Sequence, residues 1–303
     1  MKQLKNPILK DLFNKGLKKL RANNADKAAS YFQQIITSDP KNADAHFYLG
    51  LALRALGKIN QSQISLERSA ELNPRSSEIH YQLSLTLSAA KKHQEAIKQI
   101  NIATNLQPNS ANILSTLAFL QLELGENRAA IRNFRKAIKL EPTSALRYHN
   151  LAGALIVNKE NYLAIEALRK SIALDPSRNI SQLHLANILM ECRYTKEATS
   201  IFESLIKKNP SDYKIREKLG DLFIFEGRYA KAKEMFSIAF HLAPRELRIS
   251  IKLAESLSRM SKGEEALAII KKSNKLPNTI ALEEKTGEIL ERMGRFNEAE
   301  KKY

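Results

Sequence analysis

Apolar and polar positions alternate along the chain with a helical period, and the whole pattern repeats every 34 residues. Proline marks the repeat most clearly, at Pro40, Pro74, Pro108, Pro142, Pro176, Pro210 and Pro244. If this proline is position 32, repeats begin at residues 9, 43, 77, 111, 145, 179, 213 and 247, and a ninth begins at 280 after a one-residue deletion. A fixed period of this length is typical of repeat architectures.

Small and large apolar residues occupy fixed positions within each repeat. Position 8 is always Gly, Ser or Ala, position 20 is almost always Ala, and position 24 is large and apolar, as at Phe32 or Phe236. Positions 7, 8 and 11 share one helical stripe, and positions 20, 24 and 27 share another. Glycine at position 15 in four repeats suits the end of the first helix, and the proline stops the second. Each repeat is therefore predicted to be a pair of amphipathic helices.

This pattern resembles the tetratricopeptide repeat, from about Leu9 to Tyr303, after an N-terminal extension of residues 1–8. The resemblance implies an all-α fold, an α–α superhelix of antiparallel helix pairs whose first helices line the concave side. That family often carries a large aromatic residue at position 4. It is mostly missing here, where that position holds Leu12, His46, His80, Leu114, Tyr148, Gln182 and Arg216.

The ninth repeat stops at Tyr303, which occupies position 24 in the middle of the predicted second helix. A solenoid normally ends in a polar capping helix that covers its last apolar face. We therefore expect the protein to continue beyond this residue.

Composition supports a helical protein and indicates the cellular compartment. Ten glycines, nine prolines and 43% hydrophobic residues fit a helical chain with a buried core. Cys192 is the one cysteine, so no internal disulfide forms, and a reducing compartment is the simpler expectation. No segment approaches the roughly 20 apolar residues that cross a bilayer. We expect a cytoplasmic protein without membrane insertion.

Catalytic chemistry is absent from the sequence pattern. The six histidines are dispersed, no Cys or His spacing fits zinc, and no glycine-rich loop is left to cradle a phosphate. No base pairs with Cys192, and the carboxylates are interpreted as solvated helix faces. The sequence therefore predicts no enzyme in this segment, and no cofactor or metal.

The resemblance implies that a ligand contacts positions 2, 5, 9, 12 and 13 of the first helices. Many of these positions are apolar, and a contiguous apolar strip marks a binding site. The alternative is that these side chains pack against neighbouring repeats. Polar members include Glu217, Asp221, Glu255 and Arg259. The predicted partner-binding groove comprises Phe47, Leu51, Arg54, Tyr81, Leu85, Phe119, Leu122, His149 and Asn187.

Three function classes remain open. The first is a scaffold that binds a protein or peptide in the concave groove. The second is the substrate-recruiting arm of a larger bacterial enzyme, of sulfotransferase or glycosyltransferase type, whose catalytic domain lies beyond residue 303. The third is a nucleic-acid-binding helical repeat, which the formal charge of +17 suggests. The basic residues are dispersed over all repeats, however, and the groove positions are not their main location.

Overall fold

A computed structural model describes residues 6–273 and 279–302, which form 18 α-helices and one short 3-10 helix, with no strand among them. The first helices of the repeats are α1 (Pro7–Arg21), α3 (Ala43–Ala55), α5 (Ser77–Ala89), α7 (Ala111–Glu123), α9 (Ala145–Val157), α11 (Asn179–Glu191), α13 (Tyr213–Phe225), α15 (Leu247–Arg259) and α17 (Thr279–Arg292). The second helices are α2 (Ala25–Ser38), α4 (Ile59–Leu72), α6 (His93–Leu106), α8 (Asn127–Leu140), α10 (Asn161–Leu174), α12 (Thr195–Lys208), α14 (Tyr229–Leu242), α16 (Gly263–Ser273) and α18 (Phe296–Ala299), and the last is followed by η1 (Glu300–Lys302).

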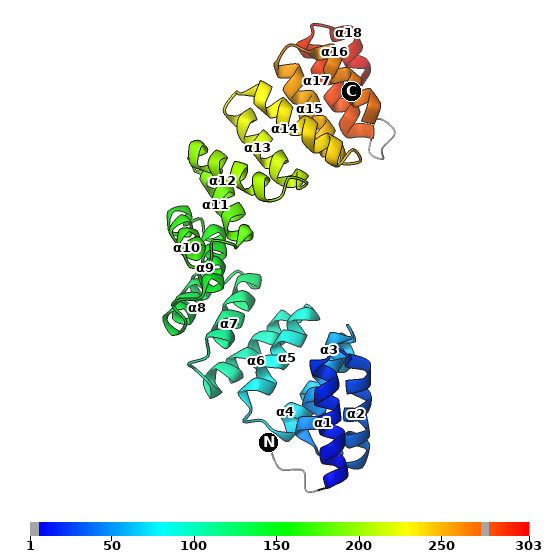
Figure 1. Ribbon diagram of the computed structural model, residues 1–303, viewed down its shortest axis with the longest axis vertical. Helices are drawn as coiled ribbons and strands as arrows, with labels where there is room; N and C mark the ends of the chain where they lie inside the picture. The colour runs from blue at the N-terminus through cyan, green and yellow to red at the C-terminus, as the bar shows by residue number, and fades with distance from the viewer. Residues whose placement is uncertain (1–5, 274–278, 303) are drawn as a thin grey trace. The chain divides into compact units, whose positions relative to one another are not determined.

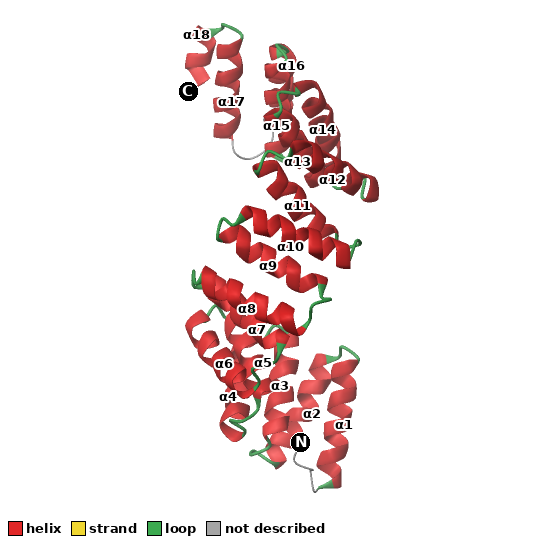
Figure 2. Cartoon of the chain, turned by 90° about the vertical axis from the view of Figure 1, so that its left-hand side faces the viewer, coloured by secondary structure: helices red, strands yellow, loops and turns green. Residues whose placement is uncertain are grey.

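The chain divides into two compact units, Met1–Ala167 and Leu168–Tyr303, which we call the N-terminal unit and the C-terminal unit. Within the N-terminal unit, α1 packs on α2, α3 on α4, α5 on α6 and α7 on α8 (Figure 1). Within the C-terminal unit, α11 packs on α12, α13 on α14 and α15 on α16. All helices are drawn in red in Figure 2, where loops appear only as short connections. The predicted all-α fold of antiparallel helix pairs is confirmed.

Short polar side chains start several of the first helices. Asn42, Ser76, Ser110 and Asp212 precede α3, α5, α7 and α13, and each side chain accepts a hydrogen bond from a backbone N–H of the first turn. Such capping satisfies donors that have no partner inside the helix. The helix starts therefore follow from local sequence.

Position 15 ends the first helix in all nine repeats by adopting a left-handed backbone. Four repeats use glycine there, with φ between 72° and 77° at Gly57, Gly125, Gly227 and Gly294. The other five place a non-glycine residue in the same region: Asn23, Lys91, Lys159, Arg193 and Ser261. The turn geometry is thus imposed by helix packing, and glycine is the residue that adopts it without strain.

Position 8 lies directly beneath position 24 of the same repeat. A Cβ atom added to Gly220 would lie 2.5 Å from the ring of Phe236, and one added to Gly50 would lie 2.6 Å from Leu66. These separations are too short for carbon atoms, so the two helices of these repeats approach only because position 8 is small. The predicted role of this position is confirmed.

In three repeats, position 4 carries a side chain that hydrogen-bonds to the preceding loop. The ring Nε2 of His46 lies 3.0 Å from the carbonyl oxygen of Pro40, and His80 makes the same contact with Pro74. In the C-terminal unit, Gln182 donates to the carbonyl oxygen of Pro176 at 2.9 Å. In these repeats the side chain ties the first helix to the loop before it.

Candidate functional site

The first helices of the N-terminal unit pack in series, α1 against α3, α3 against α5 and α5 against α7. We call the surface formed by positions 5, 6, 9, 12 and 13 of α3, α5 and α7 the N-terminal first-helix face. It contains seven of the nine predicted groove residues, from Phe47 to Leu122. The structure shows that these seven differ in how much surface they present.

Phe47 belongs to the core. Its side chain is 8% exposed and packs in a cluster with Leu66, Ile79 and Leu83. Leu51 and Tyr81 are half-buried and pack against the same cluster. The predicted groove is therefore continuous with the core, because residues at positions 5 and 9 pack against the core and also line the groove.

Phe119 presents the largest apolar surface of the predicted groove residues. It is 46% exposed, while the edge of its ring packs on Phe134 with centroids 5.1 Å apart. That contact with a fully buried ring holds the side chain in place. Leu122, one helical turn later, is half-buried. Phe119 thus packs one part of its ring on Phe134 and presents the rest to water.

A hollow of about 600 Å³ lies between α5 and α7 and includes two predicted groove residues, Leu85 and Phe119. Leu120 contributes a third apolar side chain. The polar residues that line the hollow are Ser88, Lys91, His93, Thr116 and Glu123. The hollow therefore combines three apolar with five polar side chains, so it is more polar than a typical small-molecule pocket.

His93 gives this hollow an unsatisfied polar atom. Its Nδ1 is buried and has no hydrogen-bond partner in the described part of the chain. Buried polar atoms are nearly always hydrogen-bonded, so an unpaired one in a residue that lines a hollow marks that residue as a candidate contact. The groove prediction omitted His93 because this residue begins the second helix, α6, whereas the prediction considered first helices alone.

Arg54 links α3 to α5 across the same face. Its guanidinium donates to the backbone carbonyl of Gln82 at 3.2 Å, to the Gln82 side-chain oxygen at 2.5 Å and to Thr86 at 3.4 Å. Burial lowers the pKa of Arg54 from its ordinary value. The residue therefore fixes the register of two neighbouring first helices as well as lining the predicted groove.

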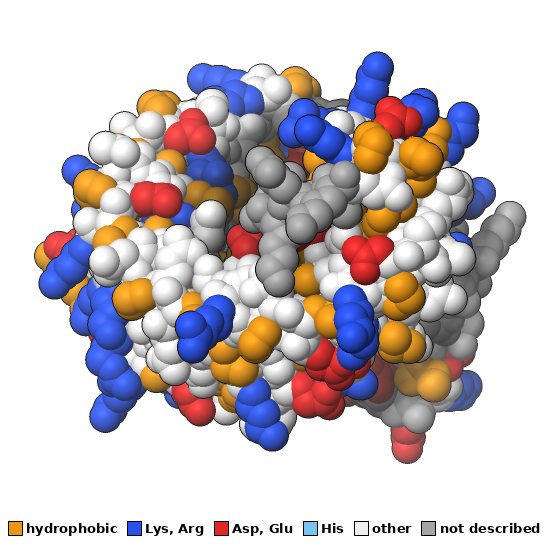
Figure 3. Space-filling model, turned by 90° about the horizontal axis from the view of Figure 1, so that it is seen from below, with side chains coloured by type: hydrophobic (Ala, Val, Ile, Leu, Met, Phe, Trp, Pro, Cys, Tyr) orange, Lys and Arg blue, Asp and Glu red, His pale blue; other side chains and the backbone are white. Residues whose placement is uncertain are grey.

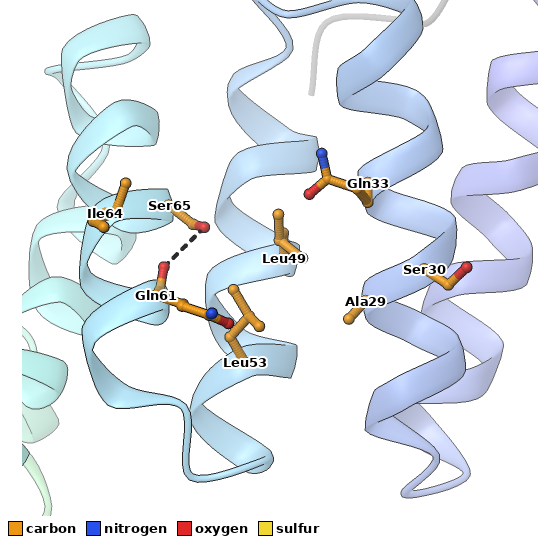
Figure 4. Close-up of a pocket in the computed structure, with 8 residues that line it drawn as sticks. All are labelled: Ala29, Ser30, Gln33, Leu49, Leu53, Gln61, Ile64 and Ser65. Carbon is orange, nitrogen blue, oxygen red and sulfur yellow. Dashed lines mark hydrogen bonds between the residues drawn. The ribbon is translucent and has the colours of Figure 1, made fainter.

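A second hollow of the N-terminal unit, about 460 Å³, lies among α2, α3 and α4 (Figure 4). Leu49 and Leu53 of α3 lie between Ala29, Ser30 and Gln33 of α2 and Gln61, Ile64 and Ser65 of α4. Ser65 donates to the carbonyl oxygen of Gln61 at 3.1 Å, within its own helix. Ile64 is 67% exposed at the edge of the hollow. None of these residues was predicted to line the groove.

The last two predicted groove residues are not among those that line the hollow between α5 and α7. His149 is half-buried on α9 of the N-terminal unit. Asn187 is half-buried on α11 of the C-terminal unit, and its Oδ1 is buried without a hydrogen-bond partner among the described residues. Each unit therefore has one unsatisfied polar atom beside a predicted groove position.

In the C-terminal unit, corresponding positions of the first helices form an ion-pair network. Glu217 of α13 is only 3% exposed and accepts hydrogen bonds from Arg248 at 2.8 Å and Lys252 at 2.7 Å, both on α15. Lys252 also pairs with Asp221 at 2.7 Å. The interpretation of these carboxylates as solvated was wrong, because each faces a basic side chain about one repeat further along the chain.

Glu255 continues this network from α15. It pairs with Arg259 at 2.8 Å on its own helix, and with Lys285 at 3.1 Å and Arg292 at 3.0 Å on α17. Burial alone would raise the pKa of Glu255, but the hydrogen bonds from Arg292, Arg259 and Lys285 outweigh it and lower the pKa to about 2. The carboxylate is therefore ionised at neutral pH and held by three cations.

Basic side chains are spread over the surface seen in Figure 3, with acidic and apolar side chains between them. Among residues 6–273 and 279–302, no group of three or more His, Cys, Asp or Glu side chains could hold a metal ion. No helix in the same ranges is both long and apolar enough to cross a membrane.

Comparison with known proteins identifies the repeat. A family model described as tetratricopeptide repeat matches residues 13–61 and 116–179. No curated protein sequence matches the chain.

Among solved structures, the C-terminal part of a TPR repeat-containing protein from Cytophaga hutchinsonii is similar with a TM-score of 0.65 and 18% identity, over 80% of this chain and 99% of that one. A crystal structure of MamA is similar with a TM-score of 0.51 and 23% identity, over 54% of this chain and 95% of that one. YrrB, described as a TPR protein with an unusual peptide-binding site, has a TM-score of 0.52 and 17% identity, over 61% of this chain and 95% of that one. At these identities the likeness shows the fold.

Proposed function

Because this chain is a tetratricopeptide-repeat protein, we propose that it is a scaffold that binds a peptide or an extended protein segment on the N-terminal first-helix face. The observation that carries the proposal is the hollow between α5 and α7, where the half-exposed ring of Phe119 lies beside Leu85 and the unsatisfied Nδ1 of His93. The similarity in fold to a peptide-binding TPR protein, YrrB, supports the same class of ligand.

An apolar side chain of the partner is the natural occupant of the hollow. It would cover Leu85 and Phe119, and removal of this surface from water favours binding by about 25 cal/mol per Å². A backbone or side-chain group of the same segment would hydrogen-bond to His93. Lys91 and Glu123, which also line the hollow, would favour segments of complementary charge over others. Interfaces of this kind depend mainly on a few aromatic anchors.

Selection of ligands from a phage-displayed peptide library tests the proposal. The affinity of the selected peptides is measured by fluorescence anisotropy with the wild type and with Tyr81→Ala/Phe119→Ala. We expect the double variant to lose about 2 kcal/mol, or roughly 30-fold in Kd.

Tyr162→Ala is the matched control, because Tyr162 is also an exposed aromatic residue of the N-terminal unit but lies on the second helix α10. We expect it to bind the peptides like the wild type. Equal affinity of the folded double variant and the wild type would exclude this face, and circular dichroism establishes that the variant is folded.

A further inference from the structure

Helix α8 carries the most one-sided charge of any helix in the protein. Its 14 residues include Arg128, Arg132, Arg135, Lys136 and Lys139, and no Asp or Glu. The second helices before and after it mix the two signs: α6 has Glu95 and Lys98, and α10 has Glu166, Arg169 and Lys170. Helix α1 has as many basic residues but also Asp11, so α8 is the one described helix with several basic residues and no acidic one.

The five basic side chains of α8 share one face. At 100° per residue they fall within an arc of about 100°, and they extend over about 16 Å of helix. The opposite face is the buried one, with Ala130, Phe134 and Ala137. All five basic side chains are exposed, and within the described residues none of them forms an ion pair or a hydrogen bond. We call this face the α8 basic stripe.

Some exposed basic residues on other helices have an acidic partner on the same helix. Lys15 pairs with Asp11, Arg68 with Glu71 and Lys262 with Glu265, each three or four residues away. The carboxylates at the two ends of α8 are engaged elsewhere. Glu126 accepts a hydrogen bond from Gln121, and Glu141 binds the buried Arg147.

Like charges at these spacings destabilise a helix. In α8, Arg132 repels Arg128 and Lys136 at a spacing of four, and Arg135 repels Lys139. The core face of α8 does not require this arrangement, because the repeated helices α2, α6 and α14 use the same buried positions without it. An external anionic partner would offset the repulsion.

We propose that the α8 basic stripe is a docking surface for an acidic segment of a partner protein, rich in Asp and Glu. Three of its five cations are arginines, whose guanidinium groups pair with carboxylates through two parallel hydrogen bonds. Cations at intervals of three and four residues match carboxylates at the same intervals on a partner helix. This surface is separate from the hollow between α5 and α7, so the inference does not depend on the proposed function.

The dimensions and side chains of the stripe favour a single acidic chain over other anionic partners. Its basic character is one helix wide, whereas a nucleic-acid duplex or a bilayer engages cations over a broad surface. No aromatic residue lies on its exposed face for bases to stack on, as single-stranded nucleic acid requires. Leu140 is the one large exposed apolar residue of α8 and lies at its end, so little can insert into a membrane.

A charge-matched pair of variants tests the inference. Arg132→Gln/Arg135→Gln/Lys136→Gln removes three charges from the stripe, and Lys10→Gln/Lys18→Gln/Arg21→Gln removes three exposed charges from α1 of the same unit. The probe is a fluorescein-labelled helical peptide with Glu at every third or fourth position, titrated at low and physiological salt. We expect the stripe variant to lose at least about tenfold in affinity and the α1 variant less than about twofold.

Two further measurements complete the test. The stripe variant should melt no lower than the wild type, because substitution relieves repulsion between exposed charges, so weaker binding cannot be due to unfolding. A duplex oligonucleotide and vesicles that contain phosphatidylserine are titrated in parallel. Equal loss of peptide binding in the two variants would overturn the proposal, as would tighter, stripe-dependent binding of the duplex or the vesicles.

Discussion

In the N-terminal unit, positions 5 and 9 of the first helices include Tyr81, Leu85 and Phe119, whereas in the C-terminal unit they include Glu217, Asp221 and Glu255. The apolar set keeps part of its surface exposed to water around a hollow. The charged set is paired with basic residues of the next first helix.

This difference shows that the repeat determines which positions of adjacent helices face each other, but not whether the residues at these positions are apolar or charged. Adjacent first helices bring position 9 of one repeat against position 6 of the next, as in the pairs Asp221–Lys252 and Glu255–Lys285. Opposite charges at these two positions form ion pairs that link adjacent first helices. In the N-terminal unit, position 9 is apolar, at Leu51, Leu85 and Phe119, and position 6 of the next repeat carries no charge. No ion pair forms between them, and part of the apolar surface stays exposed. The N-terminal unit therefore keeps an apolar surface on its first helices, and this is the surface that the proposed function uses.

The largest expected effect separates core from surface within the N-terminal unit. Phe47→Ala should lower the free energy of unfolding by about 3–4 kcal/mol, because the side chain is buried and its removal leaves a cavity. Phe119→Ala should cost only about 1 kcal/mol, since half of that ring already faces water. Urea denaturation followed by circular dichroism measures both. Equal losses of unfolding free energy in the two variants would mean that Phe119 is a core residue and does not serve as the aromatic contact of the hollow.

The next effect concerns the ion-pair network of the C-terminal unit. Glu217→Ala should destabilise the protein by about 2 kcal/mol, because it leaves Arg248 and Lys252 facing each other without their shared carboxylate. Glu197→Ala, which breaks an exposed pair with Arg169, should change stability by less than about 0.5 kcal/mol. Urea denaturation of the two variants in parallel provides the measurement. If the two variants are equally stable, the network contributes no more than ordinary surface charges.

Acid should weaken the C-terminal unit through Glu255. The folded-state pKa of about 2 lies below the ordinary value of 4.5, so the stabilisation is fully present above about pH 4.5 and is lost as pH falls toward 2. The urea midpoint of the wild type should therefore fall between pH 5 and pH 3 more steeply than that of Glu255→Gln. If the urea midpoints of the wild type and of Glu255→Gln fall equally with pH, Glu255 does not cause the loss of stability in acid.

The smallest expected effect concerns the left-handed residue at position 15, which both units have. Lys159 and Ser261 hold the left-handed position 15 in the N-terminal and C-terminal units, with φ of 61° and 60°. Substitution of either by glycine removes steric strain of about 1–2 kcal/mol and adds about 0.5–1 kcal/mol of unfolded-state entropy, so each variant should gain up to about 1 kcal/mol. Thermal melts compare the two. Opposite signs in the two units would show that the turns differ.

Much of the helical architecture was predictable from the sequence because its causes are local or lie within one repeat. The proline at position 32 stops the second helix, and small residues at position 8 make room for the residue at position 24, as Gly220 does for Phe236. The end of the first helix was inferred from glycine in four repeats. The structure shows a left-handed residue at this position in those repeats and in five that lack glycine. In those five, packing of the two helices imposes a conformation that the residue type itself disfavours.

The candidate site was only partly predictable for the same reason. Leu85 and Phe119 were predicted at the groove and lie together at the hollow, whereas His93 was missed and Phe47 proved to be buried. The α8 basic stripe was missed because the charge was considered over the whole chain and not helix by helix. Its signal, a 14-residue helix with five basic and no acidic residues, was present in the sequence.

The sequence by itself determined the period, the helix pairs and the positions that face a neighbouring helix, because these depend on residue size, periodicity and backbone preference. Only the tertiary structure decided which of two phenylalanines, Phe47 or Phe119, keeps its surface, and that Glu217 is buried between two cations. Exposure and charge pairing depend on side chains 31 to 35 residues away that the fold brings within a few ångströms. A repeat pattern specifies that these residues meet, and their packing in three dimensions sets how much surface each one retains.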